Sequence, residues 1–458
     1  MNDWTIVTRS LRARLFSTCT TVVMVAVGVA LMSVLLTMRS AGSKSFQRGT
    51  GNVHLLVSRD ASPLVSVLNG LFYAAAPAKP VAFSEFQTIS KKLPLEWAIP
   101  VQLGDSYKGA WPVLATTEEF FTRFKPAEDA AWEFADGGRF DANFKVVVGA
   151  SAARGTGLKR GDHIVLTHGS AGSRAGPIHE HDEVEYEVVG ILKPTGTAHD
   201  RALFTNLPST WLIHALDRME REGTLEHDHD ATPAANGAAT DTAHAEPHHD
   251  GHAEFPVHEE DLTDADRKIT NIYLRVLTRP GSDISAAIPV VMEQIRRDPA
   301  FQNAPFTVAG PQNEIQRLMG IVGNVDRILL AMAVVVMISS AVGIMLALYN
   351  SMEQRRRQIA ILRVLGASRG RIFGLVMTES AIIGLIGAAA GLLLGLIGGQ
   401  AAAAVMRLHL GLFIDPSIPP VIAAALGVAT LALASVAGVV PAVMAYRTSV
   451  AKNLRPMA

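Results

Sequence analysis

The chain has 458 residues, of which 49% are hydrophobic and 18% are charged, and its mean hydropathy is +0.24. The charged fraction lies below the roughly 25% of typical soluble domains, which excludes a disordered chain and argues against an ordinary soluble enzyme. Its 41 lysines and arginines balance 42 aspartates and glutamates, so no overall basic field exists to hold nucleic acid. The single cysteine, Cys19, excludes a disulfide within the chain.

Four long apolar segments predict membrane-spanning helices, since a bilayer core about 30 Å thick needs about 20 helical residues. They cover residues 18–38, 327–350, 376–399 and 421–445. The first segment follows 17 other residues, and its apolar run is longer than that of a signal peptide. We therefore expect it to be an uncleaved anchor.

The distribution of arginine and lysine predicts the orientation of these spans. Basic residues cluster before the first span, between the second and third, and after the fourth, so both termini are expected to be cytoplasmic. The predicted order outside the spans is a cytoplasmic N-terminal segment over residues 1–17, an outer domain over 39–326, a cytoplasmic loop over 351–372, a short outer loop over 400–420 and a cytoplasmic tail over 446–458.

The outer segment is long enough for two subdomains, and its mixture of strand and helix patterns predicts an α+β fold. Strands are expected at residues 53–57, 145–148, 163–167, 184–192, 202–205 and 271–277. Helices are expected at residues 84–93, 118–124 and 284–297.

Residues 222–266 differ from the rest of the outer segment, because they contain no lysine or arginine and are rich in histidine. We expect a disordered insert here. Neutral imidazoles bind Zn²⁺ in sets of three or four, so the insert is a candidate zinc-capturing segment, and a solvated loop without a specific ligand is the alternative. Its histidines are His227, His229, His244, His248, His249, His252 and His258. A second, weaker set in the ordered part comprises His179, His181, His199 and His214, for which ordinary surface or core positions are favoured.

The chain carries none of the common catalytic or nucleotide-binding motifs: no GxxxxGK[ST], no GxGxxG after a strand, no GxSxG and no HExxH. It is therefore predicted to be non-catalytic, and any energy for work must come from another chain.

The third predicted span contains glycines at four-residue spacing, which form one stripe on a helix. They are Gly387, Gly391, Gly395 and Gly399. Such a stripe permits close helix packing, and we expect the partner to be span two, span four or a second copy of the chain.

The predicted cytoplasmic loop is the most informative segment, with the sequence EQRRRQIAILRVLGASRGRIFGLVMTE from Glu353 to Glu379. It begins with a cationic cluster, continues with an apolar run and is broken at Gly366. By composition alone it is a positive-inside loop with a short helix lying on the membrane surface.

This string closely resembles the signature of FtsX-like permeases, the MacB and LolC/LolE type of ABC transporter subunit. The closing segment from Pro441 to Pro456 and the opening segment through the first span are also similar to that family. The resemblance implies a helical membrane protein with four spans in a one-plus-three order and a large α+β MacB-like periplasmic domain. It further implies a multi-pass protein of the bacterial inner membrane, with a cytoplasmic amphipathic helix over residues 1–17 before the first span.

The resemblance also implies that this loop is a coupling helix that binds a separate cytoplasmic ABC ATPase. The residues concerned are Arg355, Arg356, Arg357, Gln358, Ile361, Leu362, Arg363, Leu365, Gly366, Ala367 and Glu379. Gln358 departs from the family pattern, in which a glutamate is usual. The chain would move or release a periplasmic peptide, lipoprotein or metal-linked cargo, as one of two permease copies, with a periplasmic protein or lipoprotein as a further partner.

Segments of the outer domain look similar to a subgroup of these permeases that is associated with zinc-regulated loci, which keeps zinc open as cargo or signal. Two alternatives remain: a regulator of a cell-wall hydrolase of the FtsX kind, and a membrane-anchored metal sensor without transport. Both would use the same architecture.

Overall fold

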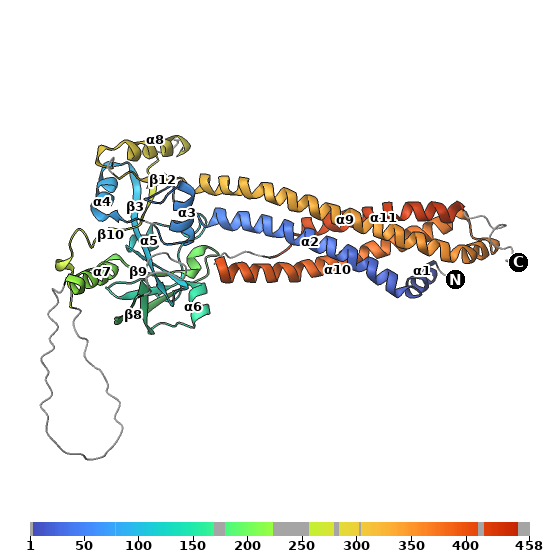
Figure 1. The fold of residues 1–458 in the computed structure, drawn as a ribbon, viewed down its shortest axis with the longest axis horizontal. Helices are drawn as coiled ribbons and strands as arrows, with labels where there is room; N and C mark the ends of the chain where they lie inside the picture. The colour runs from blue at the N-terminus through green and yellow to red at the C-terminus, as the bar shows by residue number, and fades with distance from the viewer. Residues whose placement is uncertain are drawn as a thin grey trace, which may run out of the picture. The chain divides into compact units, whose positions relative to one another are not determined.

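The computed structural model describes residues 3–77, 79–168, 179–222, 256–278, 284–301, 304–410 and 416–447. The chain divides into two compact units. The helical unit comprises Met1–Gln47 and Gln316–Ala458, and the outer unit comprises Arg48–Ile315. Figure 1 shows the long helices of the first unit and the sheet of the second.

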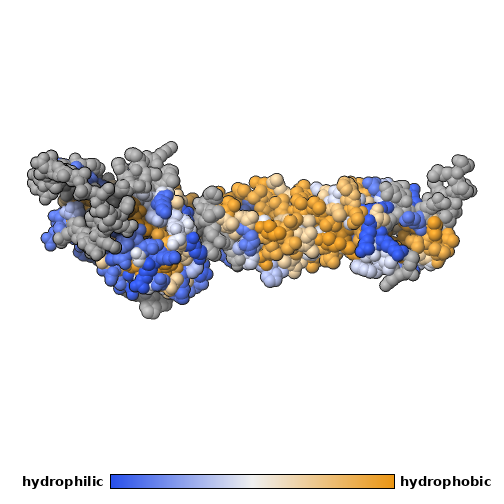
Figure 2. Space-filling model, turned by 90° about the horizontal axis from the view of Figure 1, so that it is seen from below, coloured by the Kyte–Doolittle hydropathy of each residue, from blue (hydrophilic) through white to orange (hydrophobic). Residues whose placement is uncertain are grey.

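The described residues of the helical unit form the helices α1 (Asp3–Arg12), α2 (Leu15–Arg48), α9 (Pro311–Val364), α10 (Arg369–Leu410) and α11 (Pro420–Arg447). The last four are long and apolar enough to cross a membrane, and each contains one predicted span. This confirms the four-span fold. An apolar surface covers the middle of the helical unit, as Figure 2 shows.

Two of these helices extend beyond the boundaries predicted from the sequence. The helix α9 has 54 residues, which corresponds to about 80 Å. It runs through the predicted second span and includes the apolar run expected to form a separate surface helix. The helix α10 continues to Leu410, so residues 400–410 of the predicted outer loop are helical. Apolar composition marks the part of a helix that faces lipid, but helix propensity and packing set where it ends.

The glycine stripe on α10 packs against α2, the first span. A Cβ atom on Gly387 or Gly391 would lie only 2.6 Å from Val25 or Val29 of α2, and one on Gly395 would lie 2.7 Å from the Ser33 hydroxyl. The expected partners, span two, span four or a second copy, are therefore wrong for these three glycines. The fourth, Gly399, faces Pro416 at 3.6 Å. Spacing along one helix reveals the stripe, but the partner depends on how the other helices are arranged.

The outer unit contains a ten-stranded sheet in the order β12-β1-β11-β3-β4-β9-β6-β8-β5, with β7 pairing with both β3 and β8. Neighbours are antiparallel except for β4 with β9 and β6 with β8. Its strands are β1 (Leu55–Ser58), β3 (Leu95–Tyr107), β4 (Trp111–Thr116), β5 (Phe134–Gly137), β6 (Lys145–Val148), β7 (His163–His168), β8 (His179–Leu192), β9 (Leu203–Asn206), β11 (Asn271–Val276) and β12 (Thr307–Ala309). A separate small sheet pairs β2 (Val81–Ala82) with β10 (Lys268–Ile269).

In the described ranges, the α-helices that accompany the sheets are α3 (Pro63–Phe72), α4 (Phe83–Lys92), α5 (Glu119–Thr122), α6 (Ala150–Thr156), α7 (Leu207–Glu222) and α8 (Ile284–Arg297). The α+β class is therefore confirmed. One buried cluster includes Leu55 and Trp211, and another includes Val146 and Tyr186. Both clusters are built on the same sheet, so the outer unit is one compact body rather than two subdomains.

The central strand β3 pairs with β11, β4 and β7, yet the sequence pattern did not predict it. Its 13 residues include Pro100 and Gly104, which weaken the usual signal of a strand. Gly104 has φ of +159°, close to extended backbone, and the register between β3 and β4 shifts after Leu103. Pairing on both sides compensates for the weak local preference.

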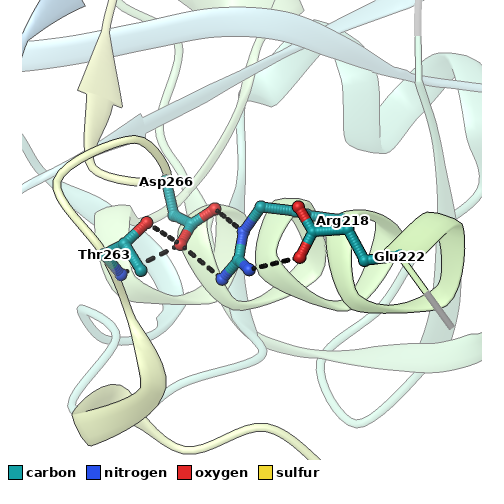
Figure 3. A network of polar contacts seen from close by, with 4 residues as sticks. All are labelled: Arg218, Glu222, Thr263 and Asp266. Atoms are coloured by element: carbon teal, nitrogen blue, oxygen red, sulfur yellow. Dashed lines mark hydrogen bonds and ion pairs between the residues drawn. The ribbon is translucent and has the colours of Figure 1, made fainter. Parts of the chain in front are cut away.

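The end of the predicted insert is folded. Residues 256–266 are described, and Val257 and Leu262 are buried in the core, which corrects the expected disorder of this part. The Asp266 carboxylate accepts hydrogen bonds from Arg218 on α7 at 2.9 and 3.0 Å and from Thr263, as Figure 3 shows. The composition of the whole segment suggested disorder, whereas its last residues pack two apolar side chains into the core and form an ion pair with α7. Residues 223–255 lie outside the described part of the chain.

The same contacts change the acidity of Asp266. Burial alone would raise the pKa of this carboxyl, but the hydrogen bonds from Arg218 and Thr263 outweigh it and lower the pKa to about 2. Asp266 therefore stays ionised at neutral pH, and its ion pair joins α7 to the segment that leads into β10.

The packing of α10 on α2 predicts that Gly391→Ala destabilises the helical unit, although alanine is the better helix former. The added methyl group would overlap Val29, and overpacking of this kind costs about 1–3 kcal/mol. Thermal unfolding of the detergent-purified chain measures the effect as a lower Tm. Gly427→Ala on α11 is the matched control, because its Cβ would meet no atom within 4 Å. Equal Tm values for the two variants would contradict the packing.

Candidate functional site

The reversal of the chain between α9 and α10, residues 359–371, forms an elbow that contains most of the predicted coupling residues. Gly366 has φ of +95°, a conformation that side chains disfavour, and its N–H donates to Arg363 O at 3.2 Å while that of Ala367 donates to Leu362 O at 3.0 Å. This is the usual glycine-terminated helix end. Ser368 then caps α10 by accepting from Arg371 N at 3.2 Å. The sequence signal of a helix break at Gly366 is thus confirmed.

Apolar side chains of the elbow divide into a packed set and an exposed set. Ile359 and Ala360 are buried, and Ile359 belongs to a cluster with Ile372 and residues of α11. In contrast, Ile361 is 45% exposed, Val364 63% and Leu365 78%. Three neighbouring apolar side chains are therefore presented to the surroundings at one end of α9.

The remaining predicted coupling residues occupy different surroundings. Arg356, Gln358 and Gly366 are exposed, and Leu362, Arg363 and Ala367 are partly buried. Glu379 is buried on α10, one turn or more beyond the elbow. The side chains of Arg355 and Arg357 lie outside the described part of the structure. The elbow therefore combines exposed apolar residues with arginines, as the predicted ATPase-binding surface requires.

The N-terminal helix α1 is fastened to this elbow by contacts that sequence reasoning missed. The Asp3 carboxylate accepts from Arg371 Nε at 3.0 Å, and the Ser10 hydroxyl donates to Glu379 Oε1 at 2.8 Å. Arg14, just after α1, donates to the backbone oxygen of Ser351 at 2.9 Å. The family resemblance of the opening segment implied the helix, but no local pattern indicates a partner more than 300 residues away.

The candidate zinc residues of the folded part do not form a metal site among the described residues. His199 is fully buried amid aromatic rings, with the Phe124 and Trp132 centroids at 5.3 and 5.6 Å, and it shares a hydrogen bond with Tyr73. His214 Nδ1 lies 3.4 Å from the Gln102 amide. No group of three or more histidine, cysteine or acidic side chains within the described ranges could hold a metal ion.

Of the other candidate zinc residues, the structure describes the side chain of His258 alone. His258 is exposed at the start of a short 3-10 helix (Glu259–Asp261), and its backbone N–H donates to Asp261 at 2.9 Å. His179 and His181 lie in β8, but their side chains are outside the described part. The same holds for the whole of His227, His229, His244, His248, His249 and His252.

Burial lowers the pKa of His199 to about 3, because the desolvated imidazolium would lose its hydration. This ring is therefore neutral at any physiological pH. It acts as a polar member of an aromatic core, and the sequence alone could not distinguish it from a ligand.

Comparison with known families decides the class of the chain. Residues 18–288, more than half of the chain, match the MacB-like periplasmic core domain, and residues 330–450 match the FtsX-like permease C-terminal family. The chain belongs to the FtsX/MacB-type ABC transporter permeases. The resemblance seen in the sequence is thereby confirmed, and such permeases are membrane subunits that work with an ATPase.

Individual relatives of this FtsX/MacB-type permease are distant. An uncharacterized ABC transporter permease of Methanocaldococcus jannaschii is 24% identical over 115 residues, which covers 25% of the chain and 28% of the relative. The chain thus matches little more than a quarter of that relative's length. The periplasmic region of MacB from Actinobacillus actinomycetemcomitans is 10% identical with a TM-score of 0.31, over 59% of this chain and 94% of that one. A similarity at that score carries no structural argument.

The buried His199 predicts a specific pH dependence of stability. Unfolded histidine titrates near 6.5 and folded His199 near 3, so the unfolded state binds one more proton between these values and stability falls as pH falls below 6.5. Between pH 7 and 5.5 the wild type should lose about 1 kcal/mol more than His199→Gln. Urea unfolding followed by tryptophan fluorescence measures both, and equal losses would contradict a neutral, buried His199.

Proposed function

We propose that this permease is the membrane subunit of a complex in which the elbow binds a separate cytoplasmic ABC ATPase. The observation that carries the proposal is the exposure of Ile361, Val364 and Leu365 beside the arginines of the elbow. Exposed apolar groups rimmed by charge are typical of a binding surface. Arg363 of the elbow and Arg356, just before it on α9, would attract an acidic rim on the ATPase, while the apolar side chains enter a groove of that partner.

The helix α9 would carry the motion of the elbow to the outer unit. It is continuous for 54 residues, and only Gly310 separates it along the chain from β12. An ion pair at 3.7 Å between Arg39 and Asp326 ties it to α2. A displacement at the elbow therefore becomes a displacement of a stiff rod, without a lumen through the spans. The working complex would contain two permease copies in a bacterial inner membrane, with both termini cytoplasmic.

The outer unit would move or release a periplasmic substrate, with a peptide, a lipoprotein or a metal-linked cargo as the candidate classes. The histidine-rich segment between α7 and residue 256 favours a link to zinc, because it offers imidazoles in pairs. Arg218 and Asp266, in the folded residues on either side of this segment, form an ion pair. Zinc would then be cargo or signal, rather than a resident cofactor of the fold.

The elbow proposal predicts that Leu365→Asp separates ATPase binding from folding. Because Leu365 is 78% exposed, the variant should keep the wild-type Tm, yet its association with the ATPase that co-purifies with the wild-type chain should weaken at least about tenfold. Co-purification and permease-stimulated ATP hydrolysis measure the loss. Leu277→Asp in the outer unit, at another exposed leucine, serves as the control. Full ATPase retention by Leu365→Asp would contradict the proposal.

The zinc link predicts tight Zn²⁺ binding by the full chain that is lost when the histidines between residues 227 and 252 are changed to glutamine. The substitution keeps segment length and removes the imidazole ligands. Competition titration with a chelating dye measures the affinity, and His163→Gln is the control, because His163 is an exposed histidine of β7 outside the candidate ligand set. If the wild type binds no zinc, or the variant binds equally well, the link to zinc is wrong.

A further inference from the structure

A cavity lies between α1, the end of α9 and the start of α10, within the helical unit. Its volume is about 290 Å³, and it is lined from α1, from the end of α9 and from the start of α10. Among the lining side chains are Ile6 of α1, Leu362 of α9 and Leu375 of α10. The cavity is thus a groove whose walls belong to three different helices.

The groove is lined mainly by apolar side chains, and it has one cationic side chain, Arg9, at its rim. Most lining side chains are aliphatic, and the polar ones are Arg9, Ser10, Gln358 and Glu379. The Glu379 carboxylate is engaged by Ser10 at 2.8 Å. Arg9 is exposed, and it forms no ion pair with any residue that the structure describes. A ligand that fits would therefore have an apolar tail and an anionic group for Arg9.

The groove lies where such ligands are concentrated. Around α1 the large side chains Trp4, Leu15 and Phe16 are exposed, Phe16 by 88%. An amphipathic helix with exposed aromatic groups and arginines is typical of the membrane–water interface. Figure 2 shows hydrophilic residues gathered beside the apolar surface toward the end of the helical unit. Lipid head groups and acyl chains meet at this depth.

We propose that the groove binds one phospholipid with an anionic head group. One acyl chain would lie among Ile6, Leu362 and Leu375, and the phosphate would accept hydrogen bonds from the Arg9 guanidinium. The bound lipid contacts α1, α9 and α10. Its presence therefore stabilises the packing of α1 on α10, which the Asp3–Arg371 and Ser10–Glu379 contacts also hold. This site does not depend on whether the elbow binds an ATPase.

Native mass spectrometry of the full chain, released from nanodiscs of phosphatidylglycerol or phosphatidylcholine with identical acyl chains, tests the proposal. The wild type should retain one phosphatidylglycerol molecule with an affinity about tenfold higher than Arg9→Gln. Arg12→Gln is the matched control, since Arg12 is an exposed arginine of the same helix that does not line the groove. It should retain the lipid like the wild type.

Three results would overturn the proposal. One is equal retention of phosphatidylglycerol by Arg9→Gln and Arg12→Gln, and another is equal retention of the two lipids by the wild type. The third is displacement of phosphatidylglycerol by oleate at equal concentration, which would show that a phosphate is not recognised. Ala13→Phe, which narrows the groove at an exposed lining position, tests the acyl site independently. It should reduce retention of the lipid without a change in the Tm of the lipid-free chain in detergent, and undiminished retention would contradict an acyl chain in this groove.

Discussion

Within a membrane every backbone N–H and C=O must find its partner inside the protein, and the helical unit depends on this constraint. A helix satisfies these groups locally, so the spans are helices that continue without a break through the apolar region. The same requirement keeps α9 unbroken across the roughly 20 residues that cross the bilayer core, and helix propensity and packing extend it to 54 residues. The chain reverses only beyond the apolar part, at Gly366, where a glycine conformation and the Ser368 cap satisfy the free backbone groups. The candidate functional surface, the elbow, therefore lies just beyond the apolar part of α9, where the backbone is no longer required to be helical.

Close approach of small residues then holds the spans together. Between apolar helices in lipid there is little hydrophobic driving force, so van der Waals contact at short range must stabilise the bundle. Gly387, Gly391 and Gly395 let α10 lie directly on α2. The first span is thereby joined to the C-terminal helices, although the whole outer unit, Arg48–Ile315, separates them in sequence. This contact makes one unit of two distant parts of the chain.

The core of the outer unit contains polar side chains, and burial of these groups costs free energy unless they are neutral or paired. His199 is buried as a neutral ring among aromatic side chains, because an imidazolium there would be severely desolvated. Asp266 stays charged because Arg218 and Thr263 bond to its carboxylate. The two residues show opposite outcomes of burial, and the difference is whether partners for the charged form are present. Neither outcome follows from residue type alone.

The four spans, the α+β class, the helix break at Gly366 and the family itself could all be predicted from the sequence. Each depends on local pattern or on a motif, and local pattern directly reflects the solvent that a segment meets. The partner of the glycine stripe, the central strand β3, the folding of residues 256–266 and the attachment of α1 to the elbow were decided by the tertiary structure. In each case the stabilising group is far away in sequence: Val29 for Gly391, β11 and β4 for β3, Arg218 for Asp266, and Glu379 for Ser10. A linear pattern states what a residue prefers, whereas only the folded chain determines which distant residue meets that preference.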